Sequence, residues 1–266
     1  MDAVISIFVW CLAMGAVVGF LAGLLGIGGG LIMVPALVYL FMHKLQLDLS
    51  FAMPMAIATS LSTIMFTGFS ASVAHYKLGN LDRFVLLYSG VGMALGAIIG
   101  AQFASILPGE LLKNVFAVLV IAIVIYMIFG KRIESARQVN KTNLSIIGLA
   151  TGSLSALMGI GGGAIFVPAL LWFNIDIKRA IGCAAFCGLI IAIFGSLSFV
   201  QAGWHHTDLP PLSFGYVYLP ASLGIVLLSV FTASWGAKLG QSLDTLLLKK
   251  IFAGFLVLVS LRMLLG

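Results

Sequence analysis

Two glycine-rich runs are the residues of this chain whose types and spacing could do chemistry. The sequence Gly-Ile-Gly-Gly-Gly occupies residues 26–30 and recurs at 159–163, followed in each case by a proline, Pro35 or Pro168. Glycine lets a ligand approach the backbone closely, and the first amide N–H groups of a helix have no partner within that helix. A helix beginning at each run would present unpaired amides and partial positive charge, which together favour a small anion.

Long apolar segments surround both runs and must position them. Hydrophobic residues make up 62% of the chain and charged residues only 8%, whereas a soluble domain carries about 25% charged residues. The chain is therefore predicted to be an all-α polytopic membrane protein whose surface faces lipid. The apolar segments lie at approximately 3–25, 31–42, 51–74, 84–107, 112–129, 144–158, 164–174, 180–202, 214–237 and 247–265.

Two of these segments are too short to cross a bilayer. Residues 31–42 would span about 18 Å as a helix, and 164–174 are similarly short, against a hydrocarbon core of about 30 Å. Unpaired backbone at membrane depth is tolerated only where protein buries it or a wet cavity solvates it. We therefore expect each glycine run to open a broken or re-entrant half-helix. Pro35 and Pro168, each lacking an amide donor, are expected as further structural breaks early in the half-helices.

The two halves of the chain repeat each other. Gly15 and Gly19 precede the first glycine run at the same offsets as Gly148 and Gly152 precede the second. Further matches pair 56–59 with 180–183 and 111–117 with 247–253. Ordered matches of this kind indicate duplication. We divide the chain into a first transmembrane repeat (1–130), a basic cytoplasmic loop (131–143) and a second transmembrane repeat (144–266).

The basic residues favour one of two topologies. With four crossings per half, the 14 lysines and arginines divide evenly, seven on each side. If each glycine run turns the chain back, every half makes five passes and eleven basic residues share one face against three, a usable positive-inside bias. An odd number of passes makes the repeats inverted, with both termini external. The eleven are Lys77, Arg83, Lys131, Arg132, Arg137, Lys141, Lys178, Arg179, Lys238, Lys249 and Lys250, and the three are Lys44, Lys113 and Arg262.

The candidate substrate-binding residues lie at the glycine runs and on the segment that follows each half-helix. Hydroxyls in membrane helices commonly bond to their own backbone or to a neighbouring helix, and glycines there often only permit close helix packing. That packing role is expected for Gly15, Gly19, Gly92, Gly96 and Gly100. The residues predicted to contact substrate are Gly26, Gly28, Gly29, Gly30, Thr59, Ser60, Gly159, Gly161, Gly162, Gly163 and Cys183.

Several classes of function have no support in the sequence. No aspartate or glutamate lies deep within an apolar segment, where proton and cation relays place one. There is no nucleophile–base pair and no metal-ligand spacing, so we expect neither an enzyme nor a bound cofactor or metal. The basic residues sit in short loops and set topology, so the net charge of +6 indicates no nucleic-acid partner. The expected partners are a small anionic solute and the lipid bilayer.

The doubled motif Gly-Ile-Gly-Gly-Gly followed by Val-Pro-Ala-Leu, at 26–37 and 159–170, resembles the TauE/SafE family, also called the sulfite exporter or TSUP family. The resemblance covers essentially the whole chain. It implies movement of sulfite, sulfonates or related sulfur-containing anions across the bacterial inner membrane. Family members differ in substrate and direction.

These observations together predict a secondary transporter of a small anion, working by alternating access around the two half-helix tips. Three alternatives remain open: an anion channel, a non-transporting membrane scaffold, and a cation-coupled uptake carrier for a neutral solute. In the last, unwound carbonyl groups would hold the cation.

Overall fold

A computed structural model of the chain describes residues 2–25, 29–129 and 140–240. Within these residues it contains nine helices and one short β-hairpin. The helices are α1 (Asp2–Leu25), α2 (Gly30–Lys44), α3 (Leu49–Lys77), α4 (Arg83–Ile106), α5 (Gly109–Phe129), α6 (Lys141–Met158), α7 (Gly163–Leu171), α8 (Ile177–Gly203) and α9 (Leu219–Gly240), and the hairpin strands are β1 (Ser213–Phe214) and β2 (Val217–Tyr218).

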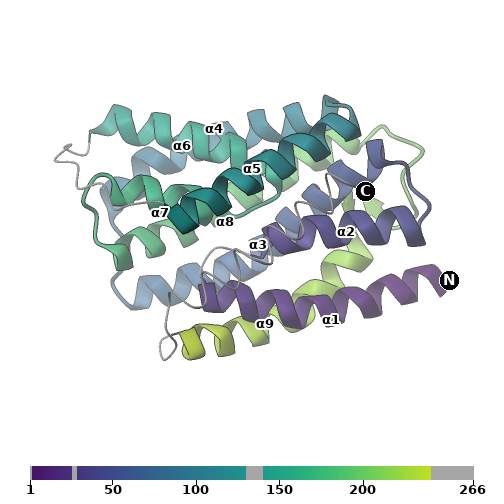
Figure 1. The fold of residues 1–266 in the computed structure, drawn as a ribbon, viewed down its shortest axis with the longest axis horizontal. Helices are drawn as coiled ribbons and strands as arrows, with labels where there is room; N and C mark the ends of the chain where they lie inside the picture. The colour runs from purple at the N-terminus through teal and green to yellow at the C-terminus, as the bar shows by residue number, and fades with distance from the viewer. Residues whose placement is uncertain (1, 26–28, 130–139, 241–266) are drawn as a thin grey trace.

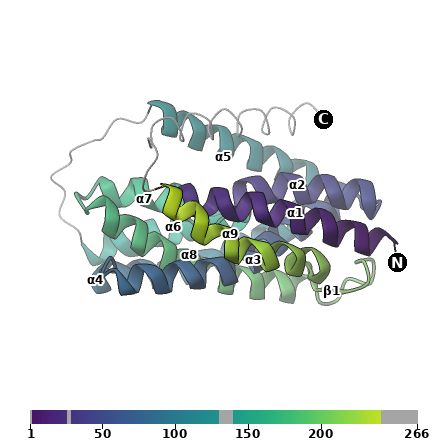
Figure 2. The ribbon, with the colours of Figure 1, turned by 90° about the horizontal axis from the view of Figure 1, so that it is seen from below.

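The helices form one bundle in which α3, α5 and α9 are tilted against α1, α2 and α4 (Figure 1). Helices α4 and α6 pack together along one edge, and α1 and α9 pack together along the opposite edge. Helices α3 and α8 pack against each other between these pairs, with α2 on α3 and α7 on α8. Helix α5 lies on one face of the bundle (Figure 2), packs against α3 and buries Phe116. The half-helices α2 and α7 therefore lie beside the two central helices.

Short connections reverse the chain at the two ends of the bundle. Asp82 ends one connection by capping α4, its Oδ1 accepting hydrogen bonds from the amides of Phe84 (2.9 Å) and Val85 (3.2 Å). Asp176 caps α8 in the same way by accepting from the amide of Lys178 at 3.0 Å. Such caps satisfy amides that the first helical turn leaves unpaired.

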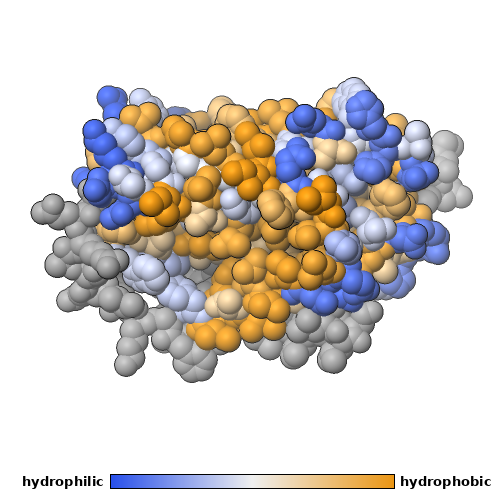
Figure 3. Space-filling model, turned by 90° about the horizontal axis from the view of Figure 1, so that it is seen from above, coloured by the Kyte–Doolittle hydropathy of each residue, from blue (hydrophilic) through white to orange (hydrophobic). Residues whose placement is uncertain are grey.

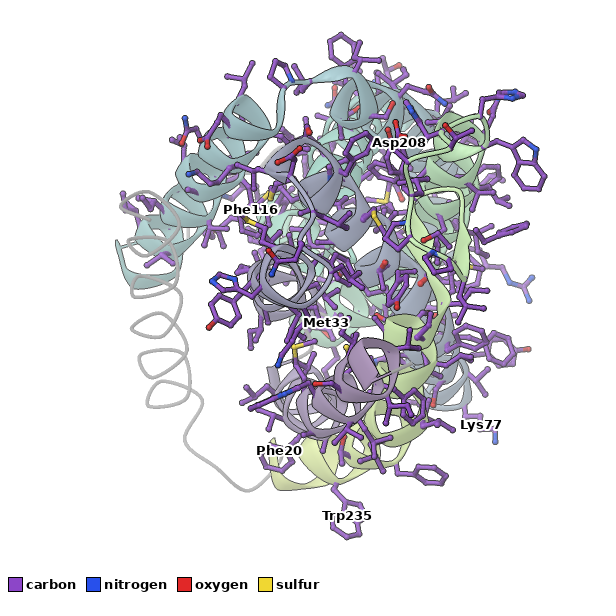
Figure 4. All side chains as sticks on the ribbon, turned by 90° about the vertical axis from the view of Figure 1, so that its right-hand side faces the viewer. Phe20, Met33, Lys77, Phe116, Asp208 and Trp235 are labelled. Atoms are coloured by element: carbon purple, nitrogen blue, oxygen red, sulfur yellow. The ribbon has the colours of Figure 1, made fainter. Side chains whose placement is uncertain are left out.

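The outer surface matches a bilayer. Figure 3 shows an apolar band across the middle of one face, with hydrophilic residues at both ends of the bundle. Large apolar side chains point outward within this zone; Trp235, which Figure 4 shows projecting away from α9, is 72% exposed. Exposed apolar surface of this extent requires an apolar surrounding. Five described helices contain spans long and apolar enough to cross a membrane: Val4–Leu21, Leu49–Lys77, Arg83–Ile106, Gly109–Tyr126 and Lys178–Gly203. The predicted all-α polytopic membrane fold is confirmed at this level.

Helix packing explains five of the predicted packing glycines. A Cβ added to Gly15 or Gly19 on α1 would overlap backbone atoms of Ile225 or Ser229 on α9. On α4, a Cβ on each of Gly92, Gly96 and Gly100 would overlap a backbone carbonyl oxygen of α6. These glycines let the helix backbones touch, so their predicted packing role is confirmed.

The helix bounds differ from the edges of two segments read from the sequence. Helix α6 begins at Lys141, with Asn140 at its N-cap, so the last three residues of the predicted loop 131–143 are helical. A polar first turn is compatible with a helix that begins outside the lipid. The segment 214–237 is not helical from its start, because Gly215 turns the chain with φ 55° and strands β1 and β2 pair antiparallel before α9 begins. The predicted segment 247–265 lies outside the described residues.

Candidate substrate site at the two glycine breaks

The second glycine run interrupts the helix in the interior of the bundle. Helix α6 ends at Met158, and Gly159 follows with φ 68°. The amide of Gly159 donates to the carbonyl of Ala156 (3.2 Å), and the amide of Ile160 donates to the carbonyl of Ser155 (2.9 Å). This pair of bonds is the Schellman arrangement, which needs a left-handed residue and therefore favours glycine. The predicted break at this run is confirmed.

Helix α7 then begins with its amides unpaired. Its N-cap is Gly162, with φ 75° and no side-chain cap. The carbonyl of Gly162 accepts from the amides of Ile165 (3.1 Å) and Phe166 (2.8 Å). None of the hydrogen bonds among the described residues uses the amides of Gly163 or Ala164. The start of α7 thus presents free donors at the positive end of the helix dipole.

The first glycine run lies partly outside the described residues. Gly26 and Gly28 fall in the range 26–28, of which nothing is described. Helix α1 ends at Leu25, and α2 begins at Gly30 with Gly29 as its N-cap. With 15 residues α2 is about 22 Å long, and α7 with nine is about 14 Å. Both are short of the bilayer, as predicted for half-helices.

The two breaks meet inside the bundle. A Cβ added to Gly30 would overlap the carbonyl oxygen of Gly159 and lie 2.9 Å from the Cα of Ile160. A Cβ on Gly159 would lie 2.8 Å from Cγ2 of Val34 on α2. Gly30, Gly159 and Ile160 are all buried. The start of α2 therefore rests directly on the turn that ends α6, which brings the described part of the first glycine run against the second run.

The central helices enclose this junction. On α8, a Cβ added to Gly188 would overlap the carbonyl oxygen of Gly161, so the two backbones touch. On α3, Cγ2 of Ile64 lies 3.3 Å from the position of a Cβ on Gly161. The Ser60 hydroxyl of α3 donates to the carbonyl of Gly159 at 2.7 Å. Helices α3 and α8 therefore hold the second break from both sides.

The hydroxyls predicted to contact substrate have protein partners. Ser60 bonds to Gly159, and Thr59 Oγ1 accepts from the amide of Tyr218 at 3.0 Å, which joins α3 to the β-hairpin. Thr63 Oγ1, on the next turn, contacts the sulfur of Met33 at 3.3 Å, near the middle of the bundle in Figure 4. Contact between these hydroxyls and a solute stays a prediction.

Cys183 lies away from the junction, at the start of α8. Its Sγ accepts a hydrogen bond from the amide of Asp82 at 3.4 Å, in the connection between α3 and α4. Gly188, which touches Gly161, comes five residues later on the same helix, roughly 7 Å further along the axis. The structure does not bring Cys183 together with the glycine breaks.

The prolines lie within their helices. Helix α2 continues beyond Pro35 to Lys44, and α7 continues beyond Pro168 to Leu171. Each proline removes one intrahelical hydrogen bond without ending the helix. The interruptions of the chain are therefore made by the glycine runs, while Pro35 and Pro168 are local departures from regular helical hydrogen bonding.

One polar residue beside the second break was missed in the sequence. Ser155, in the last turn of α6, is fully buried, and its Oγ has no hydrogen-bond partner. This oxygen lies 3.6 Å from the position of a Cβ on Gly162. Thr151, one turn earlier, is also buried and also close to Gly162. Thr151 and Ser155 are four residues apart and so share a face of the helix that leads into the glycine run. This spacing is the feature of the sequence that could have pointed to Ser155.

No charged side chain is buried in the described part of the chain. Its buried hydroxyl groups belong to serines, threonines and the two tyrosines Tyr216 and Tyr218, all of them neutral. No group of three or more histidine, cysteine, aspartate or glutamate side chains that could hold a metal ion occurs among the same residues. The junction can therefore offer a ligand backbone amides and hydroxyls, which are neutral donors.

Comparison with known proteins also indicates a membrane transporter. The family model described as sulfite exporter TauE/SafE matches residues 11–263. A "Probable membrane transporter protein" of Haemophilus influenzae is 40% identical over 95% of this chain and 96% of its own length. "Probable membrane transporter protein MJ0441" of Methanocaldococcus jannaschii is 27% identical over 94% of the chain and 93% of its own length, and YunE of Bacillus subtilis, with the same description, is 27% identical over 96% and 97%.

No solved structure matches the chain. The family match spans almost the whole length and includes both glycine runs. The chain belongs to the TauE/SafE family of membrane transporters.

Proposed function

We propose that this transporter moves a small anion (sulfite, a sulfonate or a related sulfur-containing oxyanion) across the bacterial inner membrane by secondary transport. The observation that carries the proposal is the buried contact of Gly30 with Gly159, which brings both helix breaks to one place. Helix termini and glycine backbone are suited to anions. Because the buried polar side chains of the described residues are uncharged, the backbone would supply much of the binding.

The architecture supports an inverted duplication. Gly15 and Gly19 of α1 rest on Ile225 and Ser229 of α9; their sequence counterparts Gly148 and Gly152 of α6 rest on Ser89 and Met93 of α4. The same pair of glycines thus makes the same kind of interface at both edges of the bundle. In inverted-repeat transporters, substrate lies between the repeats near the bilayer midplane, beside discontinuous helices.

Charge supports an orientation. Lys77 and Arg83 flank the connection between α3 and α4, and Lys178 and Arg179 begin α8 at the same end of the bundle. Lys141, at the start of α6, shares that end. Lys44 and Lys113 lie at the other end, with the described N-terminus. The end richer in lysine and arginine would be cytoplasmic.

Alternating access would follow from the opposite directions of the half-helices. From the junction, α2 runs toward the end that holds Lys44, and α7 runs toward the end that holds Lys178. Motion of α1, α2 and α9 against α4, α6 and α7, about the central pair α3 and α8, would open the junction to one side at a time. The glycine contacts would have to separate and reform in each cycle.

The test is flux into liposomes that contain the purified protein. Sulfite, thiosulfate and a sulfonate are each supplied with and without a pH gradient, and with and without sodium. Saturable anion flux supports the proposal, whereas non-saturating flux indicates a channel. Sodium-dependent uptake of a neutral solute without anion flux would favour the carrier alternative, and no flux of any solute would favour a scaffold.

Variants then locate the path. Gly29→Leu and Gly162→Leu are expected to abolish flux in correctly inserted protein, because each places a side chain at a helix start. Gly68→Leu on α3 is the control, since a Cβ at Gly68 meets Leu189 only at ordinary contact distances of 3.6–3.7 Å. Full flux in both Gly29→Leu and Gly162→Leu would contradict the site.

A further inference from the structure

The two half-helix starts are not equivalent, and their difference bears on how an anion is held. We infer that the substrate anion binds at the start of α7, between the Ser155 hydroxyl and the amides of Gly163 and Ala164, and that the site selects monoanions. The inference rests on the proposed function. It adds which side chain binds the anion, which of the two half-helix starts holds it and what charge the anion carries.

Ser155 is a buried donor without an acceptor. Four buried side-chain polar atoms in the described residues have no hydrogen-bond partner, on Ser155, Ser196, Ser213 and Tyr218. Of these, the Ser155 Oγ lies beside a glycine run, 3.6 Å from the position of a Cβ on Gly162. A buried hydroxyl is normally paired because leaving it unpaired is unfavourable. A ligand at the start of α7 that accepts a hydrogen bond from the Ser155 hydroxyl would supply the missing partner.

The backbone supplies the other donors at the same place. Gly163 and Ala164 are the first two residues of α7, and their amides are unpaired among the described hydrogen bonds. Both amides lie at the positive end of the helix dipole. One hydroxyl and two amides give three donors, enough for the oxygens of a sulfonate-type head group.

The start of α2 lacks the side-chain component. In the register that aligns Gly15 with Gly148, the counterparts of Thr151 and Ser155 are Val18 and Ala22. A Cβ on Gly29 would overlap Cγ1 of Val18, so a methyl group faces the α2 N-cap. The α2 side can therefore pack against the apolar part of a substrate, while the α7 side offers the Ser155 hydroxyl.

The described residues bury no charged side chain, and this limits the charge of the anion that the site can hold. Desolvation of an ion grows roughly as the square of its charge, so a dianion loses roughly four times as much hydration as a monoanion of the same size. A helix N-terminus compensates about half an elementary charge, and no buried lysine or arginine adds to it in the described part. A single negative charge suits such a site.

The experiment compares three probes of similar size on the purified full-length protein: methanesulfonate (monoanion), sulfate (dianion) and dimethyl sulfone (neutral). Binding is measured by isothermal titration, and flux is measured in liposomes. Methanesulfonate is expected to bind about tenfold or more tightly than sulfate or the sulfone, since charge decides the difference. Equal or tighter binding of sulfate would overturn the monoanion part of the inference.

Ser155→Ala tests the side chain. Loss of a hydrogen bond to a charged group is expected to weaken methanesulfonate binding about tenfold or more. Ser155→Thr, which keeps a hydroxyl, should retain most of the affinity. The matched control is Ser229→Ala, another buried serine, which lies on α9 at the edge of the bundle opposite α6. Its affinity should equal that of the wild type.

The outcomes separate the two proposals. If the wild type binds methanesulfonate and Ser155→Ala binds it as tightly as Ser229→Ala does, the inference is overturned and anion transport still stands. A wild-type protein that neither binds nor moves any of the anions would overturn the proposed function, and the inference with it. Thermal unfolding of each variant shows whether a loss of binding reflects a loss of fold.

Discussion

The Ser60 hydroxyl donates a hydrogen bond of 2.7 Å to the carbonyl oxygen of Gly159, across a sequence separation of 99 residues. Helix α3, in the first half of the chain, thereby supports the turn that interrupts the second half. Both residues are buried. The junction of the glycine breaks is therefore held by a side chain as well as by close backbone packing.

Ser60→Ala should destabilise the protein, because the buried Gly159 carbonyl would lose its side-chain donor. We expect a cost of about 1–3 kcal/mol, seen as a lower midpoint of thermal unfolding in detergent. Ser72→Ala is the control, since the Ser72 hydroxyl bonds to Gly68 of its own helix, where the backbone amide also serves that carbonyl. Equal midpoints for the two variants would show that the bond to Gly159 does not matter.

Gly162→Ala should impair transport more than Gly79→Ala. Both glycines have positive φ, 75° and 70°, so alanine at either strains the backbone by about 1–2 kcal/mol. A Cβ at Gly79 meets nothing within 4 Å, whereas one at Gly162 lies 2.7 Å from Cδ1 of Ile191. We expect a flux loss of about tenfold or more only in Gly162→Ala. Similar flux in both variants would show that backbone strain alone, and not the position of Gly162, accounts for any loss of transport.

Gly15→Val and Gly148→Val should both destabilise the bundle. Each added side chain would push apart helix backbones that touch, α1 from α9 and α6 from α4. Overpacking of this kind costs about 1–3 kcal/mol. Gly68→Val, at a looser contact, should cost less in the same unfolding assay. A large effect from only one of the first two would argue against equivalent interfaces.

Thr59→Val should loosen the β-hairpin locally. Thr59 Oγ1 is the acceptor for the buried amide of Tyr218, and valine keeps the shape while removing that oxygen. We expect the Tyr218 amide to exchange its hydrogen about tenfold or more faster. Thr67→Val, whose hydroxyl bonds only to carbonyls of α3, serves as control. Unchanged exchange at Tyr218 after Thr59→Val would contradict this role.

The proposed orientation can be read from single cysteines introduced at the two ends of the bundle. Lys113→Cys should react with a membrane-impermeant maleimide in intact cells, and Lys178→Cys only after permeabilisation. The three native cysteines, Cys11, Cys183 and Cys187, are buried, and replacing them with alanine removes background. The reverse labelling pattern would invert the topology.

Local features of the sequence were sufficient to predict the class of protein and most of its helices. Composition decided the membrane class, because so few charged residues cannot cover a soluble surface. The glycine run at 159–163 predicted the end of α6 and the start of α7, since Gly159 and Gly162 adopt conformations that other residues rarely take. The short lengths of α2 and α7 followed from the lengths of the apolar segments. Pro35 and Pro168 did not by themselves predict where a helix ends, because one missing hydrogen bond inside a packed helix does not end it.

Tertiary structure alone decided what lies next to the junction. That Gly30 rests on Gly159, that Ser60 holds the same turn and that Cys183 lies elsewhere all depend on packing between distant segments. Helical periodicity gives the face of a residue and not its partner, and a serine in an apolar helix can equally bond to its own backbone. Only the folded chain shows that the Ser155 hydroxyl has no such partner and stands beside the start of α7.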